Sequence, residues 1–208
     1  QQSRVPEEII PEAPVLSPEQ ALQSFTVPAG FEVEIAASEP FVNSPVAMEF
    51  DENGRMWVVE MTGYMPDADG KGEEARVGSI VTLEDTDDDG RVDKRTVFLD
   101  KLQMPRAICL VNDGVLVAEP PFLWFCQDTN GDGKSDVKEI VDDKYGSQGN
   151  PEHTSNGLMM ALDNWIYSAN HTSRYKKIDG KWVKEATSGR GQWGISQDNY
   201  GRIYFNSN

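Results

Sequence analysis

Two short acidic segments of this sequence carry oxygen ligands at the spacing of a calcium-binding loop. The segments start at Asp85 and Asp128, and they match each other position by position. Oxygen-bearing side chains at positions 1, 3 and 5, with Gly at position 6 for a sharp turn, are typical of calcium loops. The predicted ligands are Asp85, Asp87, Asp89, the Arg91 carbonyl and Asp93 in the first loop, and Asp128, Asn130, Asp132, the Lys134 carbonyl and Asp136 in the second. We expect structural calcium in both loops; the alternative is that Asp, Asn and Gly simply form good turns.

A histidine and two arginines could form a site for proton transfer. Arg106, His153 and Arg190 each stand in a polar segment just before an apolar run. An imidazole can remove a proton while guanidinium groups stabilise a developing oxyanion or hold an anionic cofactor. Gln192 and Trp193 follow Arg190, and the indole can stack on a sugar or cofactor ring. The alternative is that His153 bonds its own loop and the arginines pair with carboxylates.

These residues are positioned by a repeated pattern of an apolar strand, an Asx/Gly turn and a second apolar strand. Four such hairpins begin near residues 46, 107, 158 and 193. Two further strands follow each of the first three hairpins, and four-stranded meanders in series are the blades of a β-propeller. The acidic loops fall between the third and fourth strands. The sequence predicts an all-β propeller domain over residues 17–208, with about three and a half blades of a six-bladed propeller.

The N-terminal part is expected to differ from the blades. Residues 1–16 are rich in Pro and Glu and predict a flexible leader. Ser17, Pro18 and Gln20 predict the start of a short helix, with Ser17 as the N-cap. Residues 31–37 alternate in polarity and predict a half-buried strand. That strand would complete a final blade, so we expect the rest of the propeller to come from a longer chain.

The propeller geometry brings some residues together and separates others. Loops that enter the innermost strands converge on one mouth of the central channel, so Arg106, His153 and Arg190 are expected in one cleft. The acidic loops are expected at the rim. Cys109 and Cys126 fall on the first and third strands of one blade, roughly 9–10 Å apart by strand spacing. They are predicted to be unbridged, because a disulfide requires closer Cα atoms.

Composition limits the partners and the compartment. The 208-residue chain has a formal net charge of -16, which argues against nucleic-acid binding because phosphate contacts need a basic face. It has no apolar run of about 18 residues that could span a membrane. The sequence begins at Gln1 without an initiator Met, as after removal of a secretion signal. We therefore expect a periplasmic or secreted protein.

From Ser17 to Asn208 the sequence resembles the membrane-bound dehydrogenase domain family, within the wider group of soluble quinoprotein glucose and sorbosone dehydrogenases. The phrases that carry the resemblance are Ser17-Pro-Glu-Gln-Ala-Leu22, Val27-Pro-Ala-Gly-Phe31, Ala37-Ser-Glu-Pro40, Trp57-Val-Val-Glu60, Glu84-Asp-Thr-Asp87 and Leu162-Asp-Asn-Trp165. In the quinoprotein relatives a His is followed by Asp ten residues on and by Ile-Tyr thirteen and fourteen on. Here His153 precedes Asp163 and Ile166-Tyr167 at those spacings.

The resemblance implies a dehydrogenase that oxidises a sugar or alcohol by hydride transfer to pyrroloquinoline quinone and passes the electrons to a cytochrome c. It implies His153 as the general base and Arg190, with Gly194 and Gly201 at the relatives' spacing, as the group beside the quinone carbonyl. Arg106, Gln192 and Trp193 are the other expected cofactor contacts.

The sequence also departs from the pattern of these relatives. They orient their base with an Asp after the Ile-Tyr pair, whereas this chain has Asn170-His171-Thr172. Gly191 replaces an Asn that contacts the cofactor. His171 itself is either a second cleft residue or a surface residue. The alternative function is a non-catalytic propeller that binds carbohydrate or a protein partner and holds structural calcium. A lactonase-like hydrolase would need metal ligands in the channel, and no such cluster is evident at the starts of the inner strands.

Overall fold

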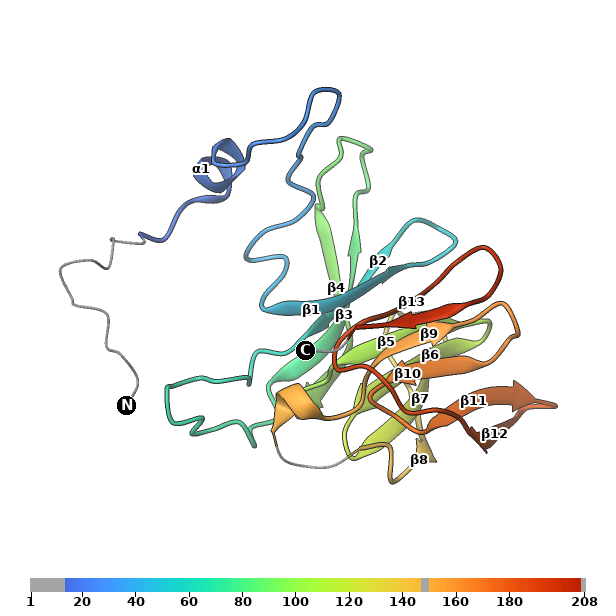
Figure 1. Ribbon diagram of the computed structural model, residues 1–208. Coiled ribbons are helices and arrows are strands. Elements are labelled where there is room, and N and C mark those ends of the chain that lie inside the picture. The colour runs from blue at the N-terminus through green and yellow to red at the C-terminus, as the bar shows by residue number, and fades with distance from the viewer. Residues whose placement is uncertain (1–13, 147–149, 207–208) are drawn as a thin grey trace, which may run out of the picture.

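The protein is described by a computed structural model that covers residues 14–146 and 150–206. It contains three four-stranded antiparallel sheets and one two-stranded sheet, each with its strands paired in chain order (Figure 1). The strands of the first sheet are β1 Pro45–Phe50, β2 Met56–Glu60, β3 Gly78–Glu84 and β4 Lys94–Leu102. Those of the second are β5 Ala107–Val111, β6 Gly114–Glu119, β7 Phe122–Gln127 and β8 Val137–Asp142. The third has β9 Asn156–Met160, β10 Ile166–Ala169, β11 Ser173–Ile178 and β12 Lys181–Ala186, and the last has β13 Ile195–Gln197 and β14 Ile203–Phe205.

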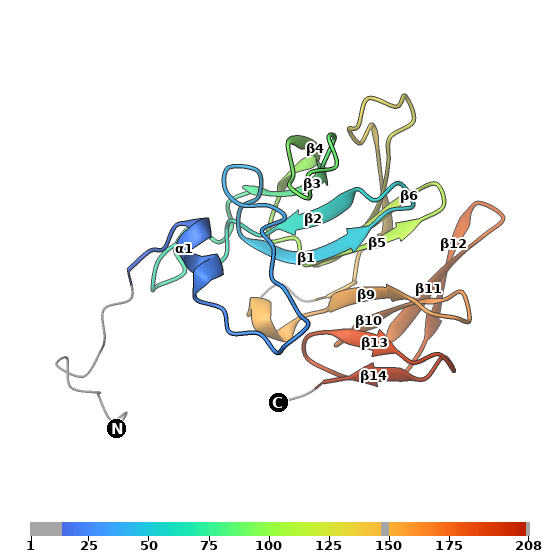
Figure 2. The ribbon, with the colours of Figure 1, turned by 90° about the horizontal axis from the view of Figure 1, so that it is seen from above.

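The four sheets are the predicted blades. β1 contacts β5, β5 contacts β9, and β9 contacts β13, so the first strand of each sheet packs beside the first strand of the next. Figure 2 shows these strands following one another from sheet to sheet. The all-β propeller prediction and its four hairpins are therefore confirmed.

Aspartates at the hairpin turns explain why three of the blades share one local geometry. Asp51 accepts hydrogen bonds from the backbone of Asn53 and Arg55 and from the Trp57 indole. Asp163 and Asp198 likewise bind turn backbone and, respectively, the hydroxyls of Tyr167 and Tyr204. Each carboxylate thus satisfies the turn and fixes an aromatic ring on the second strand.

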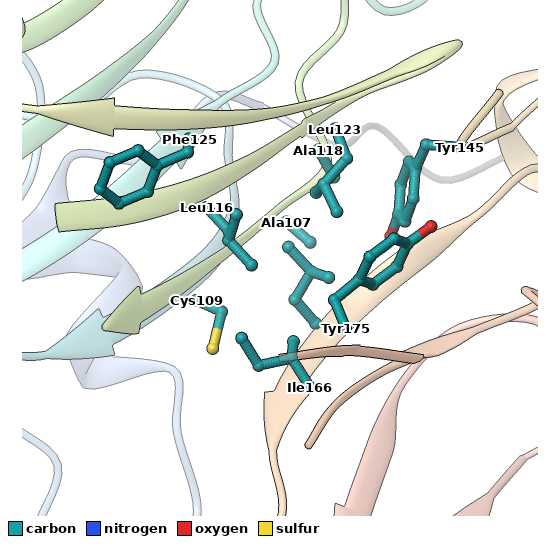
Figure 3. Packing of buried hydrophobic residues seen from close by; sticks show 10 residues of the cluster. Ala107, Cys109, Leu116, Ala118, Leu123, Phe125, Tyr145, Ile166 and Tyr175 are labelled. Atoms are coloured by element: carbon teal, nitrogen blue, oxygen red, sulfur yellow. The ribbon is translucent and has the colours of Figure 1, made fainter. Parts of the chain in front are cut away.

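Apolar side chains fill the spaces between neighbouring blades. One cluster joins the first two blades and includes Ile80, Ile108 and Cys126. A second joins the second and third blades and includes Cys109, Leu116 and Tyr175 (Figure 3). Cys109 and Cys126 are both buried and free, as predicted, because they point to opposite faces of their sheet. Burial raises the pKa of each thiol to about 12.

The N-terminal part confirms one prediction and corrects another. Helix α1 (Pro18–Gln23) has the expected capping box, in which Ser17 and Gln20 bind each other's backbone. The strand predicted over residues 31–37 is not formed among the described residues, because no strand is assigned to this segment. A strand requires a ladder of hydrogen bonds to a neighbour, whereas this segment is joined to the first acidic loop by the single bond from the Val92 N–H to the Ala36 carbonyl. The predicted leader lies mostly outside the described residues.

Two buried glutamates end the second strand of the first two blades. Glu60 accepts hydrogen bonds from the Asn43 backbone, the Ser79 hydroxyl and the Arg95 guanidinium. Glu119 repeats the arrangement with the Gln103 backbone, the Trp124 indole and Lys138. Each carboxylate therefore ties the loop that enters an inner strand to an outer strand of the same blade.

Candidate functional site

Arg106 is the predicted site residue with the most unusual environment. It directly precedes β5, and it is only 4% exposed. Its Nε and Nη1 atoms are buried without a hydrogen-bond partner. Burial lowers the pKa of the guanidinium to about 10. A cation removed from water in this way favours an anionic or strongly polar partner.

His153 and Arg190 lie in two exposed segments that are tied together. His153 ends the 3-10 helix η2 (Pro151–His153), and Arg190 lies between β12 and β13. The Asn156 side-chain amide donates to the Gln192 carbonyl at 2.6 Å, and the Asn170 N–H donates to the Arg190 carbonyl at 2.7 Å. The structure thus links the loop of His153 with the loop of Arg190. Within residues 14–146 and 150–206, no hydrogen bond or ion pair joins the side chains of Arg106, His153 and Arg190 to one another.

The polar insertion between β2 and β3 lies beside these loops. The Tyr64 hydroxyl donates to Glu152, the neighbour of His153, at 2.6 Å. Glu73 of the same insertion interacts electrostatically with Arg106. In Figure 1 the insertion and η2 lie at the same end of the molecule. The insertion therefore lies next to η2 and is bonded to it through Tyr64 and Glu152.

Gln192 and Trp193 border the last described sheet. Both are half-buried, and the Gln192 N–H donates to the Asn206 carbonyl at 2.9 Å. Trp193 lines a hollow of about 400 Å³ together with Tyr204 and Asn206. An indole beside open space can stack on a sugar ring. The position of Trp193 is therefore compatible with the predicted role in binding a sugar or cofactor ring.

A buried hydrogen-bond network centred on His171 was not foreseen from the sequence. His171 is 8% exposed, so its interpretation as a surface residue is wrong. Its Nδ1 lies 3.0 Å from the Ser155 hydroxyl and its Nε2 lies 2.7 Å from the Tyr175 hydroxyl. Tyr175 donates to Asp142 of the second blade at 2.5 Å. Lys184 also donates to Asp142, so the network joins the second and third blades.

The direction of the hydrogen bonds in this network follows from Asp142. Burial favours a raised pKa for this carboxyl, but hydrogen bonds from Lys184 and Tyr175 outweigh burial and hold the pKa below its usual value. Asp142 is therefore ionised and takes the single hydroxyl hydrogen of Tyr175. His171 must then donate from Nε2 to the Tyr175 oxygen, which leaves Nδ1 as an acceptor. The Ser155 hydroxyl hydrogen lies between this Nδ1 and the Asn170 carbonyl, which accepts from Ser155 at 3.1 Å. In the sequence, the Asn170-His171-Thr172 segment was the only sign of a special role for His171. Asp142 lies on another blade, far away in the sequence, so this segment could not indicate it as a partner.

The acidic loops lie between the third and fourth strands, as predicted. In the first loop the carboxylates of Asp85, Asp87 and Asp89 lie within 4.8 Å of one another. The negative charge of Asp89 raises the pKa of Asp87, whereas Asp93 is bound by Thr86.

The second acidic loop repeats the hydrogen bonds of the first. Asp128 accepts from the N–H groups of Asn130, Gly131 and Gly133, as Asp85 accepts from those of Asp89 and Gly90. Asp136 is bound by Thr129 and Asn130. The first loop concentrates more negative charge, because it has Asp87 where the second has Asn130.

Comparison with known proteins assigns the chain to a family. Residues 17–208 match the family described as "Domain of unknown function (DUF7133)". The chain belongs to this family. No curated protein matches the sequence.

Solved structures resemble the DUF7133 chain in fold. A gluconolactonase from Xanthomonas campestris superposes with a TM-score of 0.56 and 14% identity, over 84% of this chain and 58% of the other. A structure named a "putative gluconolactonase" gives a TM-score of 0.53 and 15% identity, over 81% and 57%. At such identity the likeness shows the β-propeller fold alone. The DUF7133 chain spans less than three fifths of either structure. The expectation of a quinoprotein dehydrogenase rests on the sequence resemblance and not on these structures.

The His171 network predicts how the stability of the DUF7133 protein depends on pH. Burial lowers the pKa of His171 to about 4, below the usual value of about 6.5. Between these values the unfolded chain takes up a proton and the folded chain does not, so stability is lost as the pH falls from about 6.5 to about 4. We expect a loss of about 2–3 kcal/mol, measured by urea unfolding across this range. His153→Gln, which removes the exposed histidine, should keep this dependence, and His171→Gln should remove it.

Proposed function

We propose that this DUF7133 chain contributes to a β-propeller enzyme that oxidises a sugar or alcohol in the manner of quinoprotein dehydrogenases. The observation that supports this most is the bond from the Asn156 side chain, three residues after His153, to the carbonyl of Gln192, two residues after Arg190. It ties together the two segments that carry the predicted base and the predicted cation. Fixed separation of these loops is what a proton-transfer site requires.

In this proposal His153 accepts the proton of the substrate hydroxyl. Its exposure at the end of η2 leaves the imidazole open to a ligand. Arg190 and Arg106 supply positive charge for oxygen atoms that gain negative charge during the reaction. Trp193 offers an apolar face for a ring, and Gln192 offers an amide that can donate or accept a hydrogen bond.

The residues present also suit an anionic quinone. Pyrroloquinoline quinone, when bound, would supply the hydride-accepting carbonyl. Arg106 fits such a group because its buried Nε and Nη1 have no partner, and Arg190, Gln192 and Trp193 would complete the contacts from this chain. In the complete enzyme the remainder of the propeller would come from a longer chain, and electrons would pass to a cytochrome c in the periplasm or outside the cell.

The test is an assay of the full-length protein with pyrroloquinoline quinone and calcium, using an artificial electron acceptor and a panel of sugars and alcohols. Hydrolysis of sugar lactones should be measured in parallel, because the structural neighbours are named gluconolactonases. We expect acceptor reduction that depends on the quinone. Lactone hydrolysis without acceptor reduction would contradict the dehydrogenase, and sugar binding without either reaction would favour a non-catalytic propeller.

We further propose that the acidic loops hold structural calcium. The clustered carboxylates of Asp85, Asp87 and Asp89 support this for the first loop, because a hard cation would relieve their repulsion. The second loop offers Asp128, Asn130, Asp132 and Asp136 at the matching positions. Both loops lie at the far end of the outer strands from η2, so the ion would stabilise blades and take no part in the reaction.

Calcium is expected to raise the stability of the full-length protein, by about 2.7 kcal/mol per site at 100 times the dissociation constant. Asp87→Ala should reduce this gain, and it should not destabilise the calcium-free protein because it removes repulsion from Asp89. Thermal unfolding with calcium and with a chelator measures both effects. Asp100→Asn, an exposed carboxylate outside the loops, is the control. An equal response to calcium in Asp87→Ala and the wild type would argue against a site in the first loop.

A further inference from the structure

The inner strand of the first blade has an exposed apolar face. Val46, Met48 and Phe50 of β1 are exposed, whereas Ala47 packs against the second blade. Glu49 also faces the second blade, because its carboxylate accepts from the Leu110 N–H at 2.8 Å and burial raises its pKa. The two sides of β1 therefore differ: one packs on a blade and the other is open.

The next blade shows what normally covers this face. Ile108 of β5 points toward the preceding blade, within the cluster between the first and second blades. It is 2% exposed, whereas Met48, which points in the corresponding direction from β1, is 52% exposed. In the described blades each inner strand packs against the inner strand of the next blade. The open face of β1 therefore resembles the face that β5 buries against the first blade, but no blade covers it among the described residues.

Backbone hydrogen bonds from the acidic loops indicate that the segment around Ala36, before β1, belongs to the same missing blade. The eighth residue of the second loop, Ser135, donates its N–H to the Phe98 carbonyl on β4, the outermost strand of the preceding blade, at 2.8 Å. The eighth residue of the first loop, Val92, donates its N–H to the Ala36 carbonyl, also at 2.8 Å. Ala36 thus takes the place that Phe98 holds one blade further on.

Spacing along the chain agrees with this equivalence. Ala36 stands nine residues before β1 begins at Pro45, and Phe98 stands nine residues before β5 begins at Ala107. Side chains of residues 32–37 alternate between exposed and half-buried, and Ala37 packs against the apolar cluster of the first blade. This is the pattern of an outermost strand that has one face on the neighbouring blade and lacks its partner strand.

We infer that residues 32–37 are the outermost strand of a closing blade, and that the inner strand of this blade covers Met48 and Phe50. The partner is a three-stranded antiparallel meander of the same ring, with an apolar inner strand and a free edge that pairs with residues 32–37. An apolar groove of about 390 Å³ between this segment and β1 is available for its side chains. Structural neighbours of which this chain spans 58% and 57% have room for such a blade. The inference depends on the fold and not on the proposed reaction.

Hydrogen exchange and one charge substitution in the full-length protein test this arrangement. Paired amides within residues 32–37 should exchange about 100-fold or more slowly than those of an unfolded chain. Met48→Asp should lower the thermal midpoint by roughly 5 °C or more, because it buries an unpaired charge in the interface. Ile140→Asp is the matched control: Ile140 is 55% exposed on β8 and should shift the midpoint by less than about 2 °C.

Three results would overturn the inference. Residues 32–37 could exchange freely, Met48→Asp could behave like Ile140→Asp, or protection could appear only at concentrations where the protein dimerises, which would make the partner a second copy. If Met48→Asp does not fold, hydrogen exchange of the wild type still decides. None of these measurements uses enzymatic activity, so loss of the dehydrogenase proposal would leave them unaffected.

Discussion

Replacement of His153 by alanine in the full-length protein is expected to lower kcat by about 10²–10⁴-fold, the usual contribution of a positioned general base. The imidazole is exposed at the end of η2, so its removal takes away a reacting group without opening a core. Thermal unfolding should therefore be nearly unchanged. Steady-state kinetics with the quinone-dependent assay, together with a melting curve, separate the two effects.

The control for His153 is chosen from the same blade. Lys181→Ala changes an exposed residue at the start of β12 and should leave kcat unaltered. Arg190→Lys and Arg190→Ala form a second pair, since the first keeps the positive charge and the second removes it. A kcat for His153→Ala within a few-fold of the wild type, in a protein that reduces the acceptor, would assign the base to another residue.

The sequence was sufficient for the blades because the signals there are local. The turn residues Asp51, Asp163 and Asp198 are followed by an aromatic residue that the same carboxylate binds. Alternation within each strand then decides which side chains enter the core. These relations span a few residues, so the hairpins and the placement of Cys109 and Cys126 on the first and third strands of one blade could be predicted directly.

Relations between blades could not be read in the same way. The Tyr175 hydroxyl binds Asp142, and Asn156 binds the Gln192 carbonyl, although these partners are far apart in sequence. The missing strand at residues 31–37 has the same origin, because polarity alternation shows that a segment can form a strand and says nothing about its neighbour. The exposure of His153 and the burial of Arg106 likewise depend on loops that the sequence does not place.

Glu60→Ala is expected to produce the largest loss of stability among the substitutions considered. The carboxylate is 2% exposed and receives hydrogen bonds from the Asn43 backbone, the Ser79 hydroxyl and Arg95. Its removal leaves Arg95 without its counter-ion beside the core. We expect a loss of about 3 kcal/mol in the free energy of unfolding, near the lower end for a broken buried pair because Arg95 keeps some contact with water.

Two variants separate the charge of Glu60 from its shape. Glu60→Gln keeps the shape and one acceptor oxygen but loses the negative charge, so it should cost less than Glu60→Ala. Glu52→Ala removes an exposed carboxylate from the turn after β1 and should change stability by less than about 0.5 kcal/mol. Urea unfolding of the three variants gives the order. If Glu60→Ala were no worse than Glu52→Ala, the loop before β1 would be held by other contacts. Glu119 occupies the same position in the second blade, so Glu119→Ala is expected to cost more stability than Glu119→Gln. The two carboxylates thus fix the loops that enter the inner strands of the first two blades in the same way.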